Sequence, residues 1–317
     1  MDLMKSKKSF LYTIIAITLL LMITFASTAV YQYKYREQSA VAEARVSTMD
    51  NFLDDLGDDI EKGVQTASYH AIIGMTNYVV ESLSYLDDSE QRFKELFALG
   101  TIYGNESFAM ENNSFQDWTD KMRIEAEKIG VNVTFSIESL EVYPIDAWTL
   151  QVSTNVTVLS EDIRHIATWT RSYSISSNIP IEGFEDPFYA VETGNGVFKI
   201  INRTIFEGNY VVGNDTTNLQ IHMNNTLYAG FNASPSFMMR FEGDMNGSEY
   251  GIESLVDKLE ISSYHPCPNG TSNTDILYWQ CSLVNAKRVA NMPSSFYMDN
   301  ETGDEGRYEK YEVGGLV

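Results

Sequence analysis

An uncharged apolar run near the amino terminus constrains this chain more than any other feature. No charged side chain occurs from Ser9 to Tyr33, and the core of the run, Phe10 to Val30, reads FLYTIIAITLLLMITFASTAV. As a helix, the 21 residues of this core would span about 31 Å, which matches the hydrocarbon thickness of a bilayer. We therefore expect residues 10–30 to form a transmembrane helix, with the lipid bilayer as a partner.

A cleaved secretory signal is the alternative interpretation of the same run. Ser27 and Ala29 are small residues at the two positions that a signal peptidase reads. The run is longer than the apolar region of a usual signal, which has roughly 7–15 residues, and this length favours the anchor. Positive charge does not decide the orientation, because basic residues precede the run at positions 5, 7 and 8 and follow it at 34, 36 and 45.

Glycosylation sequons decide the orientation instead. Eleven of the 22 asparagines stand in Asn-x-Ser/Thr sequons. Serine and threonine make up 52 of the 317 residues, so chance alone predicts about 3 or 4 sequons. The excess indicates a glycan-carrying surface outside the cell, whereas the alternative is a polar surface that is merely rich in these residue types. The candidate glycosylation sites are Asn105, Asn112, Asn132, Asn155, Asn202, Asn214, Asn224, Asn232, Asn246, Asn269 and Asn300.

Two of these asparagines fall in segments where apolar and polar residues alternate. Residues 131–137 and 148–158 show this alternation, which predicts strands with one buried face and one wet face. Asn132 and Asn155 lie on the polar side of these strands. Both side chains are therefore expected to point away from the core, where a glycan can be attached.

A helical stalk is expected after the membrane segment. From Ala42 to Leu86 apolar residues recur about every 3.7 residues, which is the period of one helical face. Glycines at 57, 63 and 74 predict a kink or a break at one of them. The apolar face needs a cover, either the protein's own sheet or a neighbouring subunit. The expected organisation is a cytoplasmic head (1–9), a transmembrane helix (10–30), the stalk (31–90) and an extracellular domain (91–317) with a further boundary near 208.

The extracellular part has the pattern of an α+β domain with an antiparallel sheet and short helices. A helix is expected over residues 113–129, capped by Ser114 and ended by Gly130. Further strands are expected after the central sheet, and a polar, mobile tail is expected near the end. The expected strands are 131–142, 146–158 and 163–176 as a meander, then 196–206, 235–242, 258–263 and 274–280; a short helix is expected over 251–258, and the tail over 299–312.

Cys267 and Cys281 are the only two cysteines, and we expect them to form one disulfide. Outside the cytoplasm a single pair most simply does so, and closing a loop of this size contributes about 3 kcal/mol in the chain-entropy account. Two buried free thiols are one alternative. A metal site that includes His265 is another, but it lacks a fourth ligand at standard spacing.

Charge and motif content limit the function. With 22 basic against 44 acidic residues the net charge is -22, which argues against nucleic acid as a partner. The sequence contains no G-x-S-x-G, P-loop or H-E-x-x-H motif, and its histidines are scattered, with His165 in an expected strand. We expect no enzymatic activity, no cofactor and no metal. The alternatives are a motif-less external hydrolase and a binding module for a cation or a basic partner, through acidic loops at 182–186 and 299–305.

The order of these features resembles that of type IV pilin-like proteins. The resemblance rests on Lys7-Lys8-Ser9, the apolar helix and its amphipathic continuation, and it is specific over residues 5–90. The chain is most similar to the uncharacterised pilin-like or single-anchor surface glycoproteins of archaea. In such families a prepilin peptidase cuts just before the apolar helix, which implies processing here between Ser9 and Phe10. Ile14 stands where many pilins carry a glutamate, so a minor pilin or a non-assembling anchored glycoprotein fits equally.

The sequence thus predicts a membrane-anchored extracellular glycoprotein with a structural or adhesive role. The resemblance further implies self-association, or contact with pilin-like subunits, through the amino-terminal helix. In this interpretation the acidic remainder of the chain lies in water outside the cell.

Overall fold

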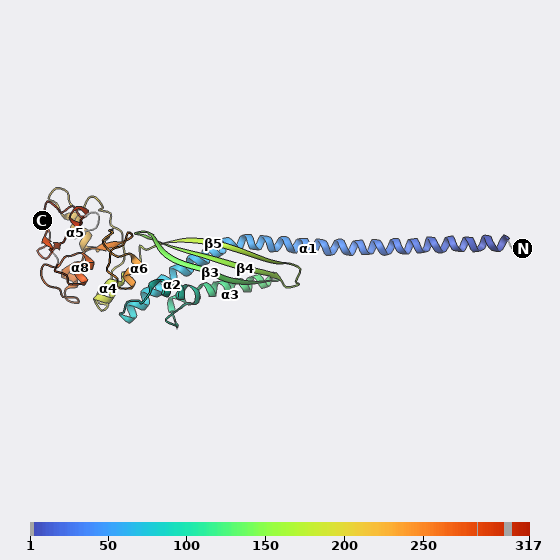
Figure 1. Cartoon of the computed structure of the whole chain (residues 1–317), viewed down its shortest axis with the longest axis horizontal. Coiled ribbons are helices and arrows are strands. Elements are labelled where there is room, and N and C mark those ends of the chain that lie inside the picture. Colours follow the sequence, from blue (N-terminus) through green and yellow to red (C-terminus); the bar gives the residue numbers. More distant parts are fainter. Residues whose placement is uncertain (1–2, 284, 301–305) are drawn as a thin grey trace.

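One very long helix organises this α+β protein. The computed structural model describes residues 3–283, 285–300 and 306–317. Helix α1, Leu3–Ser82, is continuous over 80 residues. Figure 1 shows its amino-terminal half as a bare rod that projects from a head formed by the rest of the chain, with the carboxyl terminus at the far end of the head. The expected order of a long amino-terminal apolar helix and then an antiparallel sheet with short helices is confirmed.

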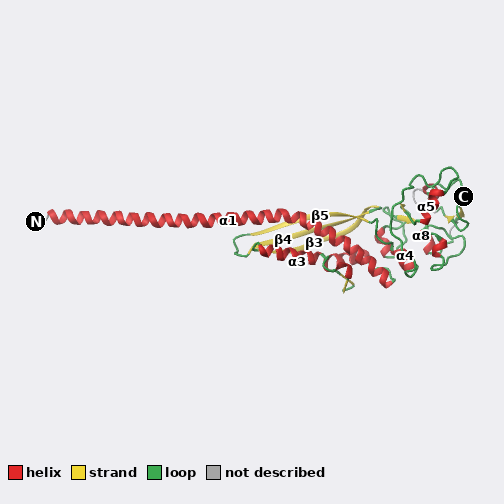
Figure 2. Cartoon of the chain, turned by 180° about the vertical axis from the view of Figure 1, so that it is seen from behind, coloured by secondary structure: helices red, strands yellow, loops and turns green. Residues whose placement is uncertain are grey.

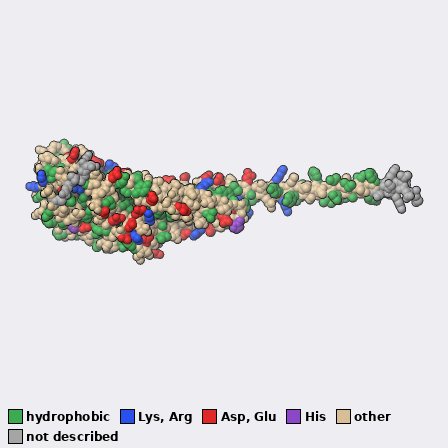
Figure 3. Space-filling model, in the orientation of Figure 1, with side chains coloured by type: hydrophobic (Ala, Val, Ile, Leu, Met, Phe, Trp, Pro, Cys, Tyr) green, Lys and Arg blue, Asp and Glu red, His purple; other side chains and the backbone are tan. Residues whose placement is uncertain are grey.

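The rod carries the apolar run. Every side chain from Phe10 to Val41 is exposed, and this part of α1 is long and apolar enough, by length and composition, to cross a membrane. Figure 3 shows apolar side chains along the rod and acidic side chains spread over the head. The implied processing point between Ser9 and Phe10 lies within the helix, while residues 1–2 of the expected cytoplasmic head lie outside the described residues.

From Met49 onward α1 enters the core of the head. Leu53, Leu56 and Ile60 follow Met49 on one face and are almost completely buried. Because they belong to the same apolar cluster as the inner face of the sheet, the apolar stripe is covered by the protein's own elements.

The three glycines of α1 do not break the helix. It stays continuous while it changes direction beneath the sheet (Figures 1 and 2). A Cβ atom at Gly63 would lie 2.8 Å from the ring of Trp118, and one at Gly57 would lie 3.2 Å from the ring of Tyr173. These glycines therefore let aromatic rings pack directly on the helix backbone.

Three long strands form the expected antiparallel meander, in the order β3-β4-β5. Inward side chains such as Val152 and Val156 are fully buried, and the outward side chains of β4 are polar apart from Leu159. A bulge between Ile137 and Ser139 interrupts the β3–β4 register, so that Ser139 pairs with Asn155. The strands are β3 (Val131–Asp146), β4 (Thr149–Asp162) and β5 (Thr168–Pro180).

Short elements connect α1 to this sheet. Helix α3 begins at a capping box between Ser114 and Asp117 and packs on β3, which confirms the expected helix. The elements between α1 and β3 are α2 (Ser89–Leu99), β1 (Thr101–Ile102), β2 (Asn105–Glu106), the 3-10 helix η1 (Phe108–Met110) and α3 (Phe115–Lys128).

Beyond Pro180 the chain forms a loop-rich region with very short elements, at the end of the head that lies away from the rod (Figure 1). The elements are α4 (Pro187–Glu192), α5 (Thr217–Asn224), β6 (Tyr228–Gly230), α6 (Phe237–Phe241), β7 (Ile252–Ser254), α7 (Lys258–Ile261), α8 (Asp275–Trp279), β8 (Lys287–Arg288), β9 (Tyr297–Met298) and α9 (Arg307–Lys310). We call residues 181–317 the distal region.

Most of the secondary structure expected in the distal region is wrong. Helices α6, α7 and α8 occupy the three windows expected as strands over 235–242, 258–263 and 274–280, and strand β7 lies where a helix was expected over 251–258. Residues 196–206 form isolated bridges at Ile200 and Arg203 instead of a strand. Short apolar runs fit a buried helix turn as well as a buried strand, so periodicity does not separate them.

The carboxyl-terminal segment is packed where the sequence predicts a mobile tail. Residues 306–312 include α9, and both Arg307 and Tyr311 are buried. Residues 301–305 lie outside the described residues. The polar sequence suggested a mobile tail, but Arg307 is buried in the distal region, where it is neutralised by Glu253 and by Asp299.

Candidate functional site

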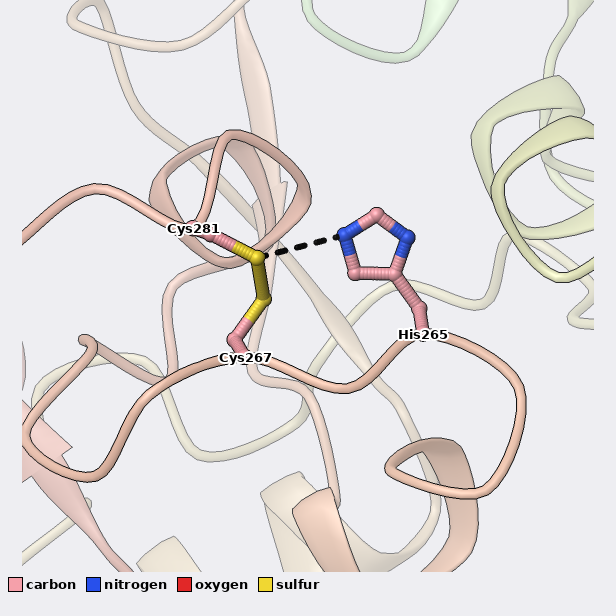
Figure 4. Close-up of side chains that lie close together, drawn as sticks. All are labelled: His265, Cys267 and Cys281. Carbon is pink, nitrogen blue, oxygen red and sulfur yellow. Dashed lines mark hydrogen bonds between the residues drawn. A yellow bond between two sulfur atoms is a disulfide. The ribbon is translucent and has the colours of Figure 1, made fainter.

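Cys267 and Cys281 form the expected disulfide, at the edge of the distal region. The bond closes a loop that contains α8. Figure 4 shows the imidazole of His265 pointing at the bond from the Cys281 side. Nε2 of His265 lies 3.6 Å from Sγ of Cys281. We call His265, Cys267 and Cys281 the disulfide corner.

Residues of two other segments fix the His265 ring. Its Nδ1 lies 3.3 Å from the backbone carbonyl oxygen of Glu192 and 3.6 Å from the carboxylate Oε2 of that residue. The other carboxylate oxygen, Oε1, accepts a hydrogen bond of 2.7 Å from the hydroxyl of Tyr85. The rings of Tyr278 and Trp279 pack against the imidazole. The imidazole of His265 therefore lies between the acceptor oxygens of Glu192 and the sulfur of Cys281.

The disulfide corner also places three residues of metal-ligating type together, one histidine and two cysteines. One ligand atom from each of the three residues lies within 4.8 Å of the others. Zinc ligation by cysteine requires thiolates, and in this state the two sulfurs are joined to each other. The corner in its oxidised form is thus a disulfide next to an imidazole.

The disulfide loop supplies a carboxylate to a fully buried arginine. Asp275, the first residue of α8, lies 2.7 Å from Nη2 of Arg240, and Asp186 lies 2.5 Å from Nη1. The hydroxyl of Tyr228 donates to Asp186 at 2.7 Å. Burial raises the pKa of the Asp186 carboxyl, and the charge of Arg240 opposes this rise. Burial disfavours the charged guanidinium, yet the two carboxylates raise the pKa of Arg240 above its ordinary value.

A second buried arginine lies beneath the same loop. Arg307 contacts Glu253 at 2.7 Å and Asp299 at 2.6 Å. The hydroxyls of Ser272 and Thr274, both inside the disulfide loop, donate to Asp299 at 2.7 and 3.0 Å. The loop therefore contacts Arg240 directly, through Asp275, and reaches Arg307 indirectly, through Asp299.

These ion pairs account for one carboxylate in each of the two acidic loops. Asp186 neutralises Arg240 and Asp299 neutralises Arg307, so both carboxylates are turned inward. The remaining acidic residues of the second loop, at 301, 304 and 305, lie outside the described residues. Neither arginine was predicted from the sequence. An arginine inside the apolar run 237–241 was the available signal, since a charge in such a run is either misplaced or paired.

The predicted glycosylation sites share one property. All eleven sequon asparagines are exposed, and all lie on the head. Among the other asparagines, Asn273 is buried and three more, Asn113, Asn195 and Asn218, are half-buried. The amide of Asn155 lies on the outer face of the sheet, where its nitrogen donates to Ser139 at 2.9 Å.

The other histidines have separate, ordinary environments. His70 contacts the backbone oxygen of Ala109, and His165 lies in the turn between β4 and β5 instead of the expected strand. His222 is fully buried and shares a 3.1 Å hydrogen bond with the hydroxyl of Thr204. Burial lowers the pKa of His222 to about 3, so its imidazole is neutral near pH 7.

Comparison with known protein families gives no match, and neither the curated proteins nor the solved structures contain a protein that matches this chain.

Proposed function

We propose that this protein is a membrane-anchored surface glycoprotein with a structural or adhesive role, organised like a pilin subunit. Residues 10–30 cross the bilayer with the amino terminus inside, and the head lies outside the cell. The exposed apolar rod supports the anchor, because such a surface is unfavourable in water and favourable in hydrocarbon.

The placement of the sequons is the observation that carries this proposal. All eleven are exposed on the head, and the first 104 residues contain none. Glycans on an anchored protein are added on the external side, so the asymmetry supports an external head. The disulfide supports the same side, because disulfides persist in oxidising compartments.

Such a protein would act mechanically, by holding its head outside the membrane. Residues 31–41 form an exposed neck of helix, and at about 1.5 Å per residue this neck is roughly 16 Å long. The core beneath the sheet holds the neck and the head as one piece. Asn132 and Asn155 on the outer face of β3 and β4 would cover that face with glycans.

Mass spectrometry of two matched variants tests the external head. Asn155 is a sequon residue, and Asn178 is an exposed asparagine without a sequon on the neighbouring strand. In protein purified from a host that glycosylates asparagine, Asn155→Gln is expected to remove the mass of one glycan and Asn178→Gln to remove none. A protein without glycan mass at any of the eleven sites would overturn the proposal.

The amino-terminal mass separates a filament subunit from a simple anchor. Loss of the first nine residues, with Phe10 as the new amino terminus, supports the pilin-like form. An intact terminus supports a single-pass anchor and removes the filament form. Protease treatment of intact cells, followed by detection of the carboxyl terminus, reports the orientation independently, because only an external head is digested.

A further inference from the structure

We propose that the disulfide corner is a directional thiol-exchange site. An external thiolate attacks Sγ of Cys267, and Cys281 leaves as a thiolate beside His265. The proposal concerns the chemistry of the head and does not depend on how the protein is anchored.

The position of His265 sets the direction. Its Nε2 lies 3.6 Å from Sγ of Cys281, and the imidazole approaches the bond from that side (Figure 4). A neighbouring imidazolium stabilises a thiolate, and in disulfide exchange the better-stabilised sulfur is the one that leaves. Cys281 is therefore the leaving sulfur and Cys267 the attacked one.

Glu192 positions the imidazole for this role. Because Nδ1 faces the backbone oxygen and the carboxylate of Glu192, the neutral ring carries its hydrogen on Nδ1. Protonation then adds a hydrogen at Nε2, which faces Cys281. Glu192 is the charged group that faces the ring in the described part of the chain, and the rings of Tyr278 and Trp279 pack against the imidazole. The hydroxyl of Tyr85 donates to Glu192.

The exchange step balances with one co-reactant, a small-molecule or protein thiol. The attacking thiolate forms a bond to Cys267, and the electron pair of the broken sulfur–sulfur bond passes to Cys281. The His265 imidazolium donates its Nε2 hydrogen to that sulfur. The product is a mixed disulfide on Cys267 and a free Cys281, and a second thiol equivalent or the reverse reaction completes the cycle.

The site is accessible. Both cysteines are half-buried, and the residues on either side of Cys267, Pro266 and Pro268, are exposed. Cys267 is thus partly open to solvent, while another part of its surface packs against the apolar core. Many structural disulfides lie deeper and lack a neighbouring imidazole, and such bonds resist exchange.

Exchange would act on the buried charges of the distal region. The closed loop presents Asp275 to Arg240 and the hydroxyls of Ser272 and Thr274 to Asp299. Opening the loop frees these groups to move away, and a buried arginine is stable only while its carboxylates are held in place. The redox state of the corner therefore controls the stability of the distal region.

Glutathione trapping of the full-length protein in detergent tests the direction. After a short exposure and an acid quench, peptide mapping is expected to place glutathione on Cys267 at least about tenfold more often than on Cys281. Equal labelling, or preference for Cys281, would overturn the proposal.

Variants test the role of His265. His265→Gln is expected to slow adduct formation about tenfold and to abolish the preference for Cys267. Glu192→Gln, which alters the positioning residue, is expected to give a smaller loss and a changed pH profile. His165→Gln, at an exposed histidine in a turn, is the control and leaves rate and preference unchanged. The oxidised variants must retain the parent melting temperature, and an unchanged rate and preference in folded His265→Gln refutes the inference.

Discussion

The guanidinium of Arg45 lies 2.9 Å from the buried carboxylate of Asp162. The same guanidinium donates to the backbone oxygen of Ile129 at 2.9 Å, so one side chain of α1 holds the end of β4 and the end of α3 together. Arg45 lies where the exposed neck meets the core. This contact therefore ties α1 to the neighbouring ends of α3 and β4, at the point where the helix leaves the core.

Arg45→Met is expected to lower the free energy of unfolding by about 1–3 kcal/mol, because it leaves the Asp162 carboxylate buried without its partner. Urea unfolding in detergent, followed by tryptophan fluorescence, measures the change. Arg36→Met is the matched control, since Arg36 lies on the exposed neck and its loss is expected to change stability by less than about 0.5 kcal/mol. Equal effects of the two variants would contradict the prediction.

Arg240→Met is expected to destabilise the head by about 3–5 kcal/mol, because two carboxylates are then buried without a compensating charge. Thermal melting at pH 7 reports the loss. Arg288→Met, at an exposed strand position, serves as the control and should melt with the parent protein. A stable Arg240→Met protein would show that the carboxylates protonate or find solvent at little cost.

Gly63→Ala tests whether packing outweighs helix propensity. Alanine favours a helix over glycine by about 1 kcal/mol, but its Cβ would lie 2.8 Å from the Trp118 ring. Overpacking costs about 1–3 kcal/mol, so we expect a net loss of stability. Gln65→Ala, at an exposed position on the same helix, is expected to be neutral or slightly stabilising. A stabilised Gly63→Ala protein would mean that the Trp118 ring moves freely.

His222 gives the stability a defined pH dependence. The pKa of its imidazole falls from an ordinary 6.5 to about 3 on folding, so below pH 6.5 the unfolded chain takes up a proton that the folded chain does not. Stability is therefore lost as pH falls, by about 2 kcal/mol between pH 7 and pH 5 from this group.

Urea unfolding of His222→Gln at pH 7 and pH 5 measures that contribution. The variant is expected to show a smaller difference between the two pH values than the parent, whatever its absolute stability. His165→Gln provides the comparison, because the side chain of His165 is exposed. An identical pH dependence in the parent and in His222→Gln would exclude His222 as its source.

The sequence predicted the central sheet and its helix well, because both rest on local patterns. The alternation around Asn132 and Asn155 fixed which side of each strand faces outward, and Ser114 and Gly130 marked the ends of α3. The disulfide followed from the presence of only two cysteines.

The distal region and the disulfide corner could not be predicted in the same way. Helix α6 and strand β7 are a few residues long and largely buried, so their residues have no polar side to reveal a period. Arg240 finds its partners 54 and 35 residues away in the sequence. Glu192 reaches His265 across 73 residues. No local pattern encodes such contacts.

The sequence by itself determined the apolar rod, the exposed sequons and the alternating strands, because hydrophobicity and side-chain direction act within a few residues of chain. Only the tertiary structure decided that the second half of α1 is covered by the protein's own sheet. It also decided that the ion pairs of Arg307 hold the carboxyl-terminal segment in place and that an imidazole faces Cys281. These features depend on charges and rings from distant segments that become neighbours only when the apolar core closes and excludes water.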